Sequence, residues 1–241
     1  MKIGVAISGC DIGGAAAFAA LNEIEKQGYD IAAVSCCSIA AVSAALYSLK
    51  TDPEECKKLM QEFLNNLAEN NTETALQNIC ARLNSAAGRK NSLIINSADI
   101  ATGAAVLFTD DFYTQAKNFT TLGTDDFFTA LSSAAAPFGE LKPYSCRGYL
   151  LCDYSLKYGS PVMALKYLGI KKTLSVNFSA AYPHTPYELA QNSMAEMHSA
   201  KSELFINISS RPASGSIANY ANAATQAISE ISAELAEKML F

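Results

Sequence analysis

Ser38 lies where an apolar strand is expected to turn directly into an apolar helix. Residues 31–35 predict a buried strand and residues 39–49 a helix rich in alanine, with only small side chains between them. A nucleophile elbow has this arrangement, because its serine sits on a strained turn and the residues two before and two after it must be small. Cys36 and Ala40 occupy those two positions. The alternative is an ordinary tight turn, in which serine is common.

A turn of small residues follows the first expected strand, which covers residues 2–8. Residues 7–14 read Ile-Ser-Gly-Cys-Asp-Ile-Gly-Gly. Backbone N–H groups at such a turn can hold an anion or a developing oxyanion. A dinucleotide-binding loop is a weaker interpretation, because Asp11 stands where the second glycine of that motif should let a pyrophosphate approach. A simple tight turn is the remaining alternative.

Asp153 follows directly on a short apolar strand expected over residues 149–152. An aspartate at a strand end can act as general base for a serine within hydrogen-bond reach. In isolation, a turn or capping role is the simpler interpretation.

Thiol chemistry is another possible function of this region, since Cys37 lies beside a predicted helix N-terminus, which lowers a thiol pKa. Buried, inert thiols explain Cys37 equally simply.

Composition narrows the class of protein. The chain has 241 residues, of which 50% are hydrophobic and 17% charged, with a net charge of −5, so we expect a single domain over residues 1–241. Clustered Lys and Arg, which nucleic-acid binding requires, are lacking. Seven cysteines without a C-x-x-C pair and only two histidines provide poor zinc ligands, so we expect no metal or cofactor. Free thiols and the missing signal-peptide pattern favour a cytoplasmic protein.

Strands alternate with helices along the chain, which predicts an α/β layered sheet. Beyond the elements named above, the expected elements are a helix over 14–27, a long helical region over 51–87, strands at 92–98 and 104–108 in a hairpin, a helix over 125–135, a helix over 161–168, a strand at 172–178, and closing helices of which the last covers 216–240. An apolar set within residues 56–76 has the spacing of one helix face, and core packing explains it more simply than lipid docking.

The order of these segments resembles the patatin-like phospholipases. That family has a glycine-rich loop after the first strand, a G-x-S-x-G elbow after the second, and a D-G-[GA] segment about a hundred or more residues later. Residues 93–103 look like the family's T-D-L-x-T-G strand and turn, and residues 130–138 look like its A-S-x-A-x-P-x-x-F helix end. Residues 152–162 look like its D-G-x…N-x-P-V segment. The resemblance covers residues 2 to about 180.

The resemblance implies a three-layer α/β/α patatin-like fold with a mostly parallel central sheet. It also implies a Ser-Asp dyad without histidine, in which Ser38 is the nucleophile and Asp153 the base. The backbone N–H groups of Gly9, Cys10 and Asp11 would form the oxyanion hole. The implied reaction is hydrolysis of a lipid or another carboxylic ester through an acyl-serine intermediate, with no cofactor.

The sequence departs from the family around this site. Residues 9–14 lack two glycines and the arginine of the family's G-G-G-x-R-G loop. The carboxylate of Asp11 would repel a developing oxyanion, unless it caps the first helix and points away, which is the favoured interpretation. Tyr154 replaces the glycine after Asp153 and is expected to narrow the entrance.

Two functions therefore compete. The leading hypothesis is a serine acyl hydrolase, and the alternative is a catalytically impaired patatin-fold protein that binds a lipid or a protein partner. The sequence leaves peripheral membrane contact and oligomeric state open.

Overall fold

The structure is a computed structural model that describes residues 1–9, 11–69, 71–116, 118–135, 142–180, 183, 185–198, 201–210 and 220–238. Its strands are β1 (Lys2–Gly9), β2 (Asp30–Cys36), β3 (Ser92–Asp99), β4 (Ala105–Phe108), β5 (Gln115–Ala116), β6 (Phe119–Leu122), β7 (Tyr144–Cys146), β8 (Tyr149–Asp153), β9 (Thr173–Ala180) and β10 (Leu204–Ser210). Its helices are α1 (Asp11–Ala15), α2 (Ala17–Lys26), α3 (Ala40–Ser48), α4 (Pro53–Ala68), α5 (Thr72–Asn84), α6 (Phe127–Ala134), α7 (Ser155–Tyr158), α8 (Val162–Tyr167), α9 (Pro186–His198) and α10 (Tyr220–Lys238).

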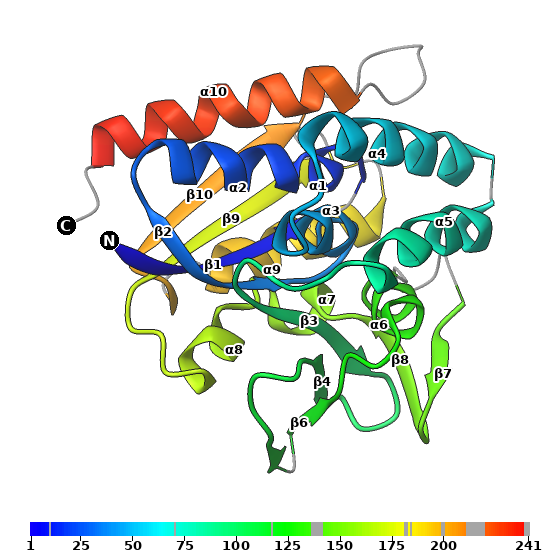
Figure 1. The fold of residues 1–241 in the computed structure, drawn as a ribbon. Coiled ribbons are helices and arrows are strands. Elements are labelled where there is room, and N and C mark those ends of the chain that lie inside the picture. The colour runs from blue at the N-terminus through cyan, green and yellow to red at the C-terminus, as the bar shows by residue number, and fades with distance from the viewer. Residues whose placement is uncertain are drawn as a thin grey trace.

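The described strands form one sheet with the order β10-β9-β1-β2-β3-β4-β6-β5, and β8 pairs with β3 and β7. Neighbouring strands from β10 to β3 are all parallel. Helices cover both faces of this parallel part, as Figure 1 shows: α2, α3 and α10 lie on one side, and α8 and α9 on the other. The sheet and its two helical layers make a three-layer α/β/α arrangement.

Alternation along β1 explains the two layers. Ile3, Val5 and Ile7 belong to the large core cluster under α2 and α3. Ala6, on the opposite face, packs in a separate cluster with residues of α8. Both sets are buried, as expected for a central strand of a parallel sheet.

Two strands run toward each other along one edge of β3. The first half of β3 pairs with β2 in parallel, with Ile95 opposite Cys36. The second half pairs with β8 in antiparallel orientation, with Ser97 opposite Asp153. Because β4 occupies the other edge of β3, the carboxyl ends of β2 and β8 meet. This register brings the Ser38 turn to the end of β8.

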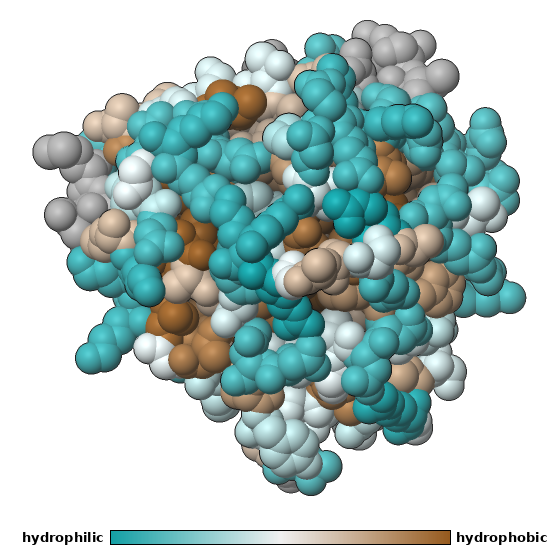
Figure 2. Space-filling view, viewed as in Figure 1, coloured by the Kyte–Doolittle hydropathy of each residue, from teal (hydrophilic) through white to brown (hydrophobic). Residues whose placement is uncertain are grey.

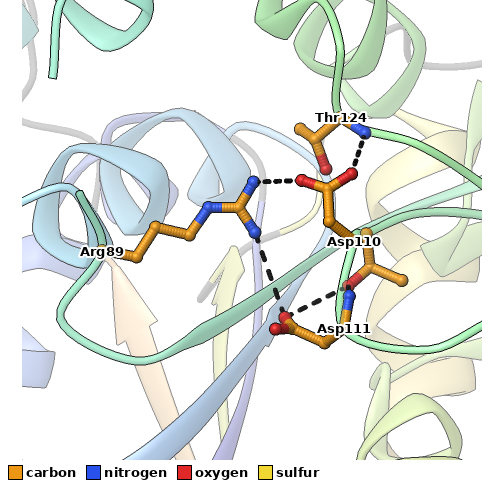
Figure 3. Close-up of polar contacts among 5 residues, drawn as sticks. Arg89, Asp110, Asp111 and Thr124 are labelled. Carbon is orange, nitrogen blue, oxygen red and sulfur yellow. Dashed lines mark hydrogen bonds and ion pairs between the residues drawn. The ribbon is translucent and has the colours of Figure 1, made fainter. Parts of the chain in front are cut away.

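An ion-pair cluster holds the segment that leads into β3. Arg89 lies 2.5 Å from Asp110 and 4.0 Å from Asp111, and the N–H of Thr124 donates to Asp110 at 2.8 Å (Figure 3). Burial raises the pKa of Asp110, but the Thr124 N–H and Arg89 outweigh it and lower that pKa overall. The cluster ties the approach to β3 to the turns after β4 and β6.

The first long helix and the last described helix pack together. Glu23 in α2 is buried, and its carboxylate accepts hydrogen bonds from Ser232 of α10 at 2.6 Å and from Gln27 at 2.8 Å. These two hydrogen bonds lower the pKa of Glu23.

The face of the molecule seen in Figure 2 is mainly hydrophilic. Its hydrophobic side chains occur in small patches that hydrophilic side chains separate.

Several elements differ from the sequence-based expectation. The helix expected over 14–27 begins at Asp11 and is interrupted at Ala16, and the region 51–87 contains two helices. The expectation that the chain closes with helices alone is wrong, because β10 precedes α10 and pairs with β9. The short strands β5, β6 and β7 were also not expected. Strands of this kind depend on pairing with distant partners, which local sequence does not encode.

Two expectations on the remaining elements are confirmed. β3 and β4 form the predicted antiparallel hairpin. The apolar face of α4 packs into the core, where Met60, Phe63 and Leu64 are buried. Among the helices of the described residues, none has the length and apolar character needed to cross a bilayer.

Candidate functional site

Ser38 occupies a strained turn between β2 and α3. Its φ is 59°, in the left-handed region that residues with a Cβ rarely adopt. The N–H of Cys37 donates to the carbonyl of Ile7 at 3.2 Å, which ties the turn to β1, and the N–H of Ala41 donates to the carbonyl of Ser38 at 3.0 Å. Asn96 of β3 donates to the Cys36 carbonyl at 2.9 Å. The Ile7 carbonyl of β1 and the Asn96 side chain of β3 therefore hold the turn from both sides.

Two glycines allow close packing around the end of β1. Gly9 has a φ of 149°, and a Cβ there would lie 2.5 Å from the Cβ of Phe178 in β9. A Cβ at Gly14 would lie 2.2 Å from the Gly9 carbonyl oxygen and 3.0 Å from the Ala40 nitrogen. Only glycine fits such close approaches. Gly14 of α1 consequently lies between the end of β1 and the first residue of α3.

The expected oxyanion residues are only partly described. Gly9 ends β1, and Asp11 begins α1. Cys10 and the side chain of Asp11 lie outside the described residues, as does the capping bond expected of Asp11. Of the residues around this loop, the structure places Gly14 beside Gly9 and beside Ala40, the first residue of α3.

Asp153 ends β8, and Asp99 of β3 fixes the start of that strand. Asp99 is buried and accepts the N–H of Leu150 at 2.9 Å and the N–H of Thr102 at 3.0 Å. Burial raises the pKa of Asp99, but these hydrogen bonds and the Thr102 hydroxyl lower it overall. The segment 93–103 thus holds β8 in the register that places Asp153.

Five residues form one network, in which Ser38, Asp153, Ser155 and Gln191 are buried and Tyr187 is half-buried. The Ser38 hydroxyl donates to Oδ2 of Asp153, and the Tyr187 hydroxyl donates to the same oxygen. The N–H of Ser155 donates to Oδ1 of Asp153 at 2.9 Å. Nε2 of Gln191 donates to the hydroxyls of Ser38 at 3.1 Å and Ser155 at 2.9 Å. The structure therefore brings the two expected dyad residues into direct contact.

The electrostatics of the network suit a general base. Ser38 and Asp153 are each 1% exposed. Burial raises the pKa of Asp153, and the hydrogen bonds from Ser38, Tyr187 and Ser155 lower it only in part, so it stays above its ordinary value. A carboxylate with a raised pKa is a stronger base toward the serine hydroxyl than an exposed one.

The thiol alternative loses support. Burial raises the pKa of Cys37 well above its ordinary value, and the nearby negative charge of Asp153 raises it further. Burial likewise raises the pKa of Cys36. Both thiols stay protonated at neutral pH, whereas nucleophilic thiol chemistry needs the thiolate.

The expectation that Tyr154 narrows the entrance is wrong. Tyr154 is buried and stacks on Tyr158, with ring centroids 4.7 Å apart and an interplanar angle of 23°. It belongs to a core cluster with Leu107, Phe119 and Ala164. The chain turns into α7 directly after Asp153, so the next side chain points into the layer beside α8 instead of toward Ser38.

Sequence reasoning missed three residues of the network, Ser155, Tyr187 and Gln191. Tyr187 and Gln191 lie on α9, one helical turn apart, and Gln191 is buried. Their spacing fits one face of a helix, but nothing in the sequence indicates that this face meets Ser38. The histidines supply no partner to the dyad among the described residues: Nδ1 of His198 contacts the carbonyl of Tyr158, and His184 lies outside them. No group of three or more metal-binding side chains occurs in the described part of the chain.

Comparisons with known proteins bear on the fold. No protein-family model matches the chain, and no curated protein matches it. The crystal structure of VipD from Legionella pneumophila matches with a TM-score of 0.56 and 11% sequence identity, over 98% of this chain and 67% of the VipD chain. VipD has a patatin fold. The protein accordingly has a three-layer α/β/α patatin-like fold with a mostly parallel central sheet, as the resemblance predicted.

Proposed function

We propose that this protein is a serine acyl hydrolase that cleaves lipid or other carboxylic esters. The observation that carries the proposal is the hydrogen bond from Ser38, at a left-handed elbow, to the buried carboxylate of Asp153. A serine is a weak nucleophile until an adjacent base removes its proton. The patatin-like fold supports the proposal, because the resemblance to the patatin-like phospholipases implies a Ser-Asp dyad in this fold. We also assign residues 1–241 to one domain in the cytoplasm.

The proposed reaction follows from these contacts. Ser38 Oγ attacks the ester carbonyl carbon while its proton passes to Oδ2 of Asp153. The tetrahedral intermediate collapses, its C–O bond to the alcohol breaks, and Asp153 returns the proton to the departing oxygen. A water molecule then attacks the acyl-serine and gives a proton to Asp153. The bond between the acyl carbon and Ser38 Oγ breaks, Asp153 returns the proton to Oγ, and the carboxylic acid leaves.

The developing oxyanion requires donors near Ser38. We assign this role to the backbone N–H groups of Gly9, Cys10 and Asp11, and the assignment is supported by Gly14, which packs against both the Gly9 carbonyl and the start of α3. Loss of one such donor typically slows an acyl transfer by about 100-fold to 1000-fold. The proposed activity therefore depends on this turn as well as on the dyad.

Hydrolysis of a p-nitrophenyl acyl ester series tests the proposal. The wild type, Ser38→Ala and Asp153→Asn would be compared at several acyl chain lengths, with spontaneous hydrolysis subtracted. We expect turnover by the wild type and background rates for both variants. A folded wild type that is no faster than Ser38→Ala across the series would refute the hydrolase function.

A second candidate function is binding without catalysis, as a catalytically impaired patatin-fold protein that takes a lipid or a protein partner. The observation that favours it is the burial of the dyad, since Ser38 and Asp153 are each 1% exposed beneath α9. A fluorophosphonate probe separates the two functions, because labelling requires an activated serine that the probe can reach. Covalent labelling that is lost in Ser38→Ala supports the hydrolase, and a wild type that stays unlabelled supports binding alone.

A further inference from the structure

We infer that Tyr187 is a positioning residue of the proposed hydrolase, which keeps the carboxylate of Asp153 oriented toward Ser38. This inference rests on the proposed function and adds a residue to its machinery. Tyr187 lies in the first turn of α9, and its hydroxyl donates to Oδ2 of Asp153. Ser38 donates to that same oxygen. The two hydroxyls thus fix which carboxylate oxygen faces the nucleophile.

Asp153 needs such a donor because it is buried without a cation. Among the residues that the structure describes, no lysine, arginine or histidine forms an ion pair with it. A buried carboxylate that lacks both a cation and hydrogen bonds takes up a proton instead. Here the negative charge is stabilised by Ser38, Tyr187 and the N–H of Ser155.

Tyr187 differs from the other two donors during the reaction. The proton of Ser38 is the one transferred, so its hydrogen bond to Asp153 changes as the reaction proceeds. The Ser155 N–H donates to the other oxygen, Oδ1. Of these three donors, Tyr187 is the one that supports Oδ2 without losing its proton. Its position is fixed by α9, since Gln191, one turn later, donates to both Ser38 and Ser155.

Few titratable groups in the described part of the chain face Asp153. They are Cys37 from the elbow, Cys152 from its own strand and Tyr187 from α9, while α7 contributes only Ser155. Burial raises the pKa of Cys152 to about 11, and that of Cys37 is also raised. Both thiols remain neutral where a carboxylate titrates, so the acidic limb of a pH–rate profile reports on Asp153.

The test is the pH dependence of kcat/KM for the wild type, Tyr187→Phe and Tyr158→Phe. The latter is a matched control, because it also removes one tyrosine hydroxyl, which donates to the carbonyl of Gly103 instead. Loss of a hydrogen bond to a charged group shifts the balance between the protonation states. We expect the acidic limb of Tyr187→Phe to move up by about one pH unit. Its kcat/KM should be about tenfold lower than that of the wild type at pH values below the limb and should match the wild type on the plateau. The limb of Tyr158→Phe should stay in place.

A limb that does not move in Tyr187→Phe, or an equal loss at every pH, would overturn the inference. If Tyr187→Phe does not fold, Tyr187→3-fluorotyrosine replaces it. This residue keeps the hydroxyl as a stronger donor and should move the limb to lower pH, and a limb that stays in place would overturn the inference.

A second measurement keeps this inference distinct from the proposed function. The carboxyl 13C resonance of Asp153, identified by its absence in Asp153→Asn, reports protonation whether or not the protein hydrolyses esters. Its titration midpoint should rise by about one pH unit in Tyr187→Phe. A wild type without turnover would refute the hydrolase while this titration still tests the contact. An unchanged midpoint would refute the role of Tyr187 while the hydrolase stands.

Discussion

The left-handed backbone at Ser38 leads to a stability prediction that activity assays do not address. Ser38→Ala and Ser38→Gly both remove the hydroxyl that bonds to Asp153, but only the alanine variant keeps a Cβ at a φ of 59°. The difference between the two variants therefore isolates the backbone strain, together with the loss of one buried methyl group. A matched pair is the wild type and Ala41→Gly, three residues later in α3, where the alanine is also buried.

The magnitudes can be estimated from the two positions. At Ala41, glycine costs about 1 kcal/mol in helix propensity and about 0.8 kcal/mol for the lost methyl group. At position 38, glycine loses the same methyl group and about 0.5–1 kcal/mol of backbone entropy. It also relieves about 1–2 kcal/mol of left-handed strain. We therefore expect Ser38→Gly to be about as stable as Ser38→Ala, whereas Ala41→Gly falls about 1.8 kcal/mol below the wild type.

Urea unfolding followed by circular dichroism measures these free energies. Equal m-values for all four proteins, that is, equal dependence of the free energy of unfolding on urea concentration, allow the free energies to be compared directly. The quantity of interest is how much alanine-to-glycine costs at position 38 compared with position 41. A cost at position 38 as large as that at position 41 would mean that the turn carries no strain. Ser38 would then not occupy an elbow, and the geometric argument for its role as nucleophile would fail.

Two further predictions concern the same site. Asp153→Asn should gain stability over the wild type as pH rises from about 4, because the raised pKa of Asp153 makes its ionised form unfavourable in the fold. The gain should level off above that pKa. Thermal unfolding of both proteins from pH 4 to 9 measures it, and a stability difference that stays constant or falls as pH rises would contradict the prediction. Gly14→Ala should lower the free energy of unfolding by about 1–3 kcal/mol, since its Cβ would lie 2.2 Å from the Gly9 carbonyl oxygen. Gly123→Ala is the control, because its nearest contacts would be an ordinary 3.4 Å, and an equal loss there would remove the case for a close approach at Gly14.

The sequence predicted those parts of the molecule whose signals are local. The elbow at Ser38, the strand that ends at Asp153 and the order of the layers follow from residue type, hydrophobic pattern and the order of motifs. What could not be predicted is the side of each element that faces the site. The meeting of Ser38 and Asp153 depends on the register of both strands on β3, which no single segment specifies.

Two particular residues illustrate the limit. The prediction that Tyr154 narrows the entrance rests on its bulk at a position where the family has glycine, yet the turn into α7 directs its ring into the core. Tyr187 was not singled out at all, because a tyrosine in the first turn of a helix carries no chemical signal of its own. Its contact with Asp153 exists only because α9 packs beside α7. Long-range packing decided both cases.

The pairing of α2 with α10 has a consequence for the order in which the protein is made. Ser232, which bonds to Glu23, lies 209 residues after it, so α2 leaves the ribosome long before its covering helix exists. The outer edge of β9 likewise stays unpaired until β10 has been synthesised. During most of synthesis the nascent chain therefore presents an uncovered helix face, and between the synthesis of β9 and that of β10 it also presents an open strand edge. Both features favour aggregation. We expect this layer to close only after α10 has emerged, which makes the nascent chain a substrate for chaperones until then.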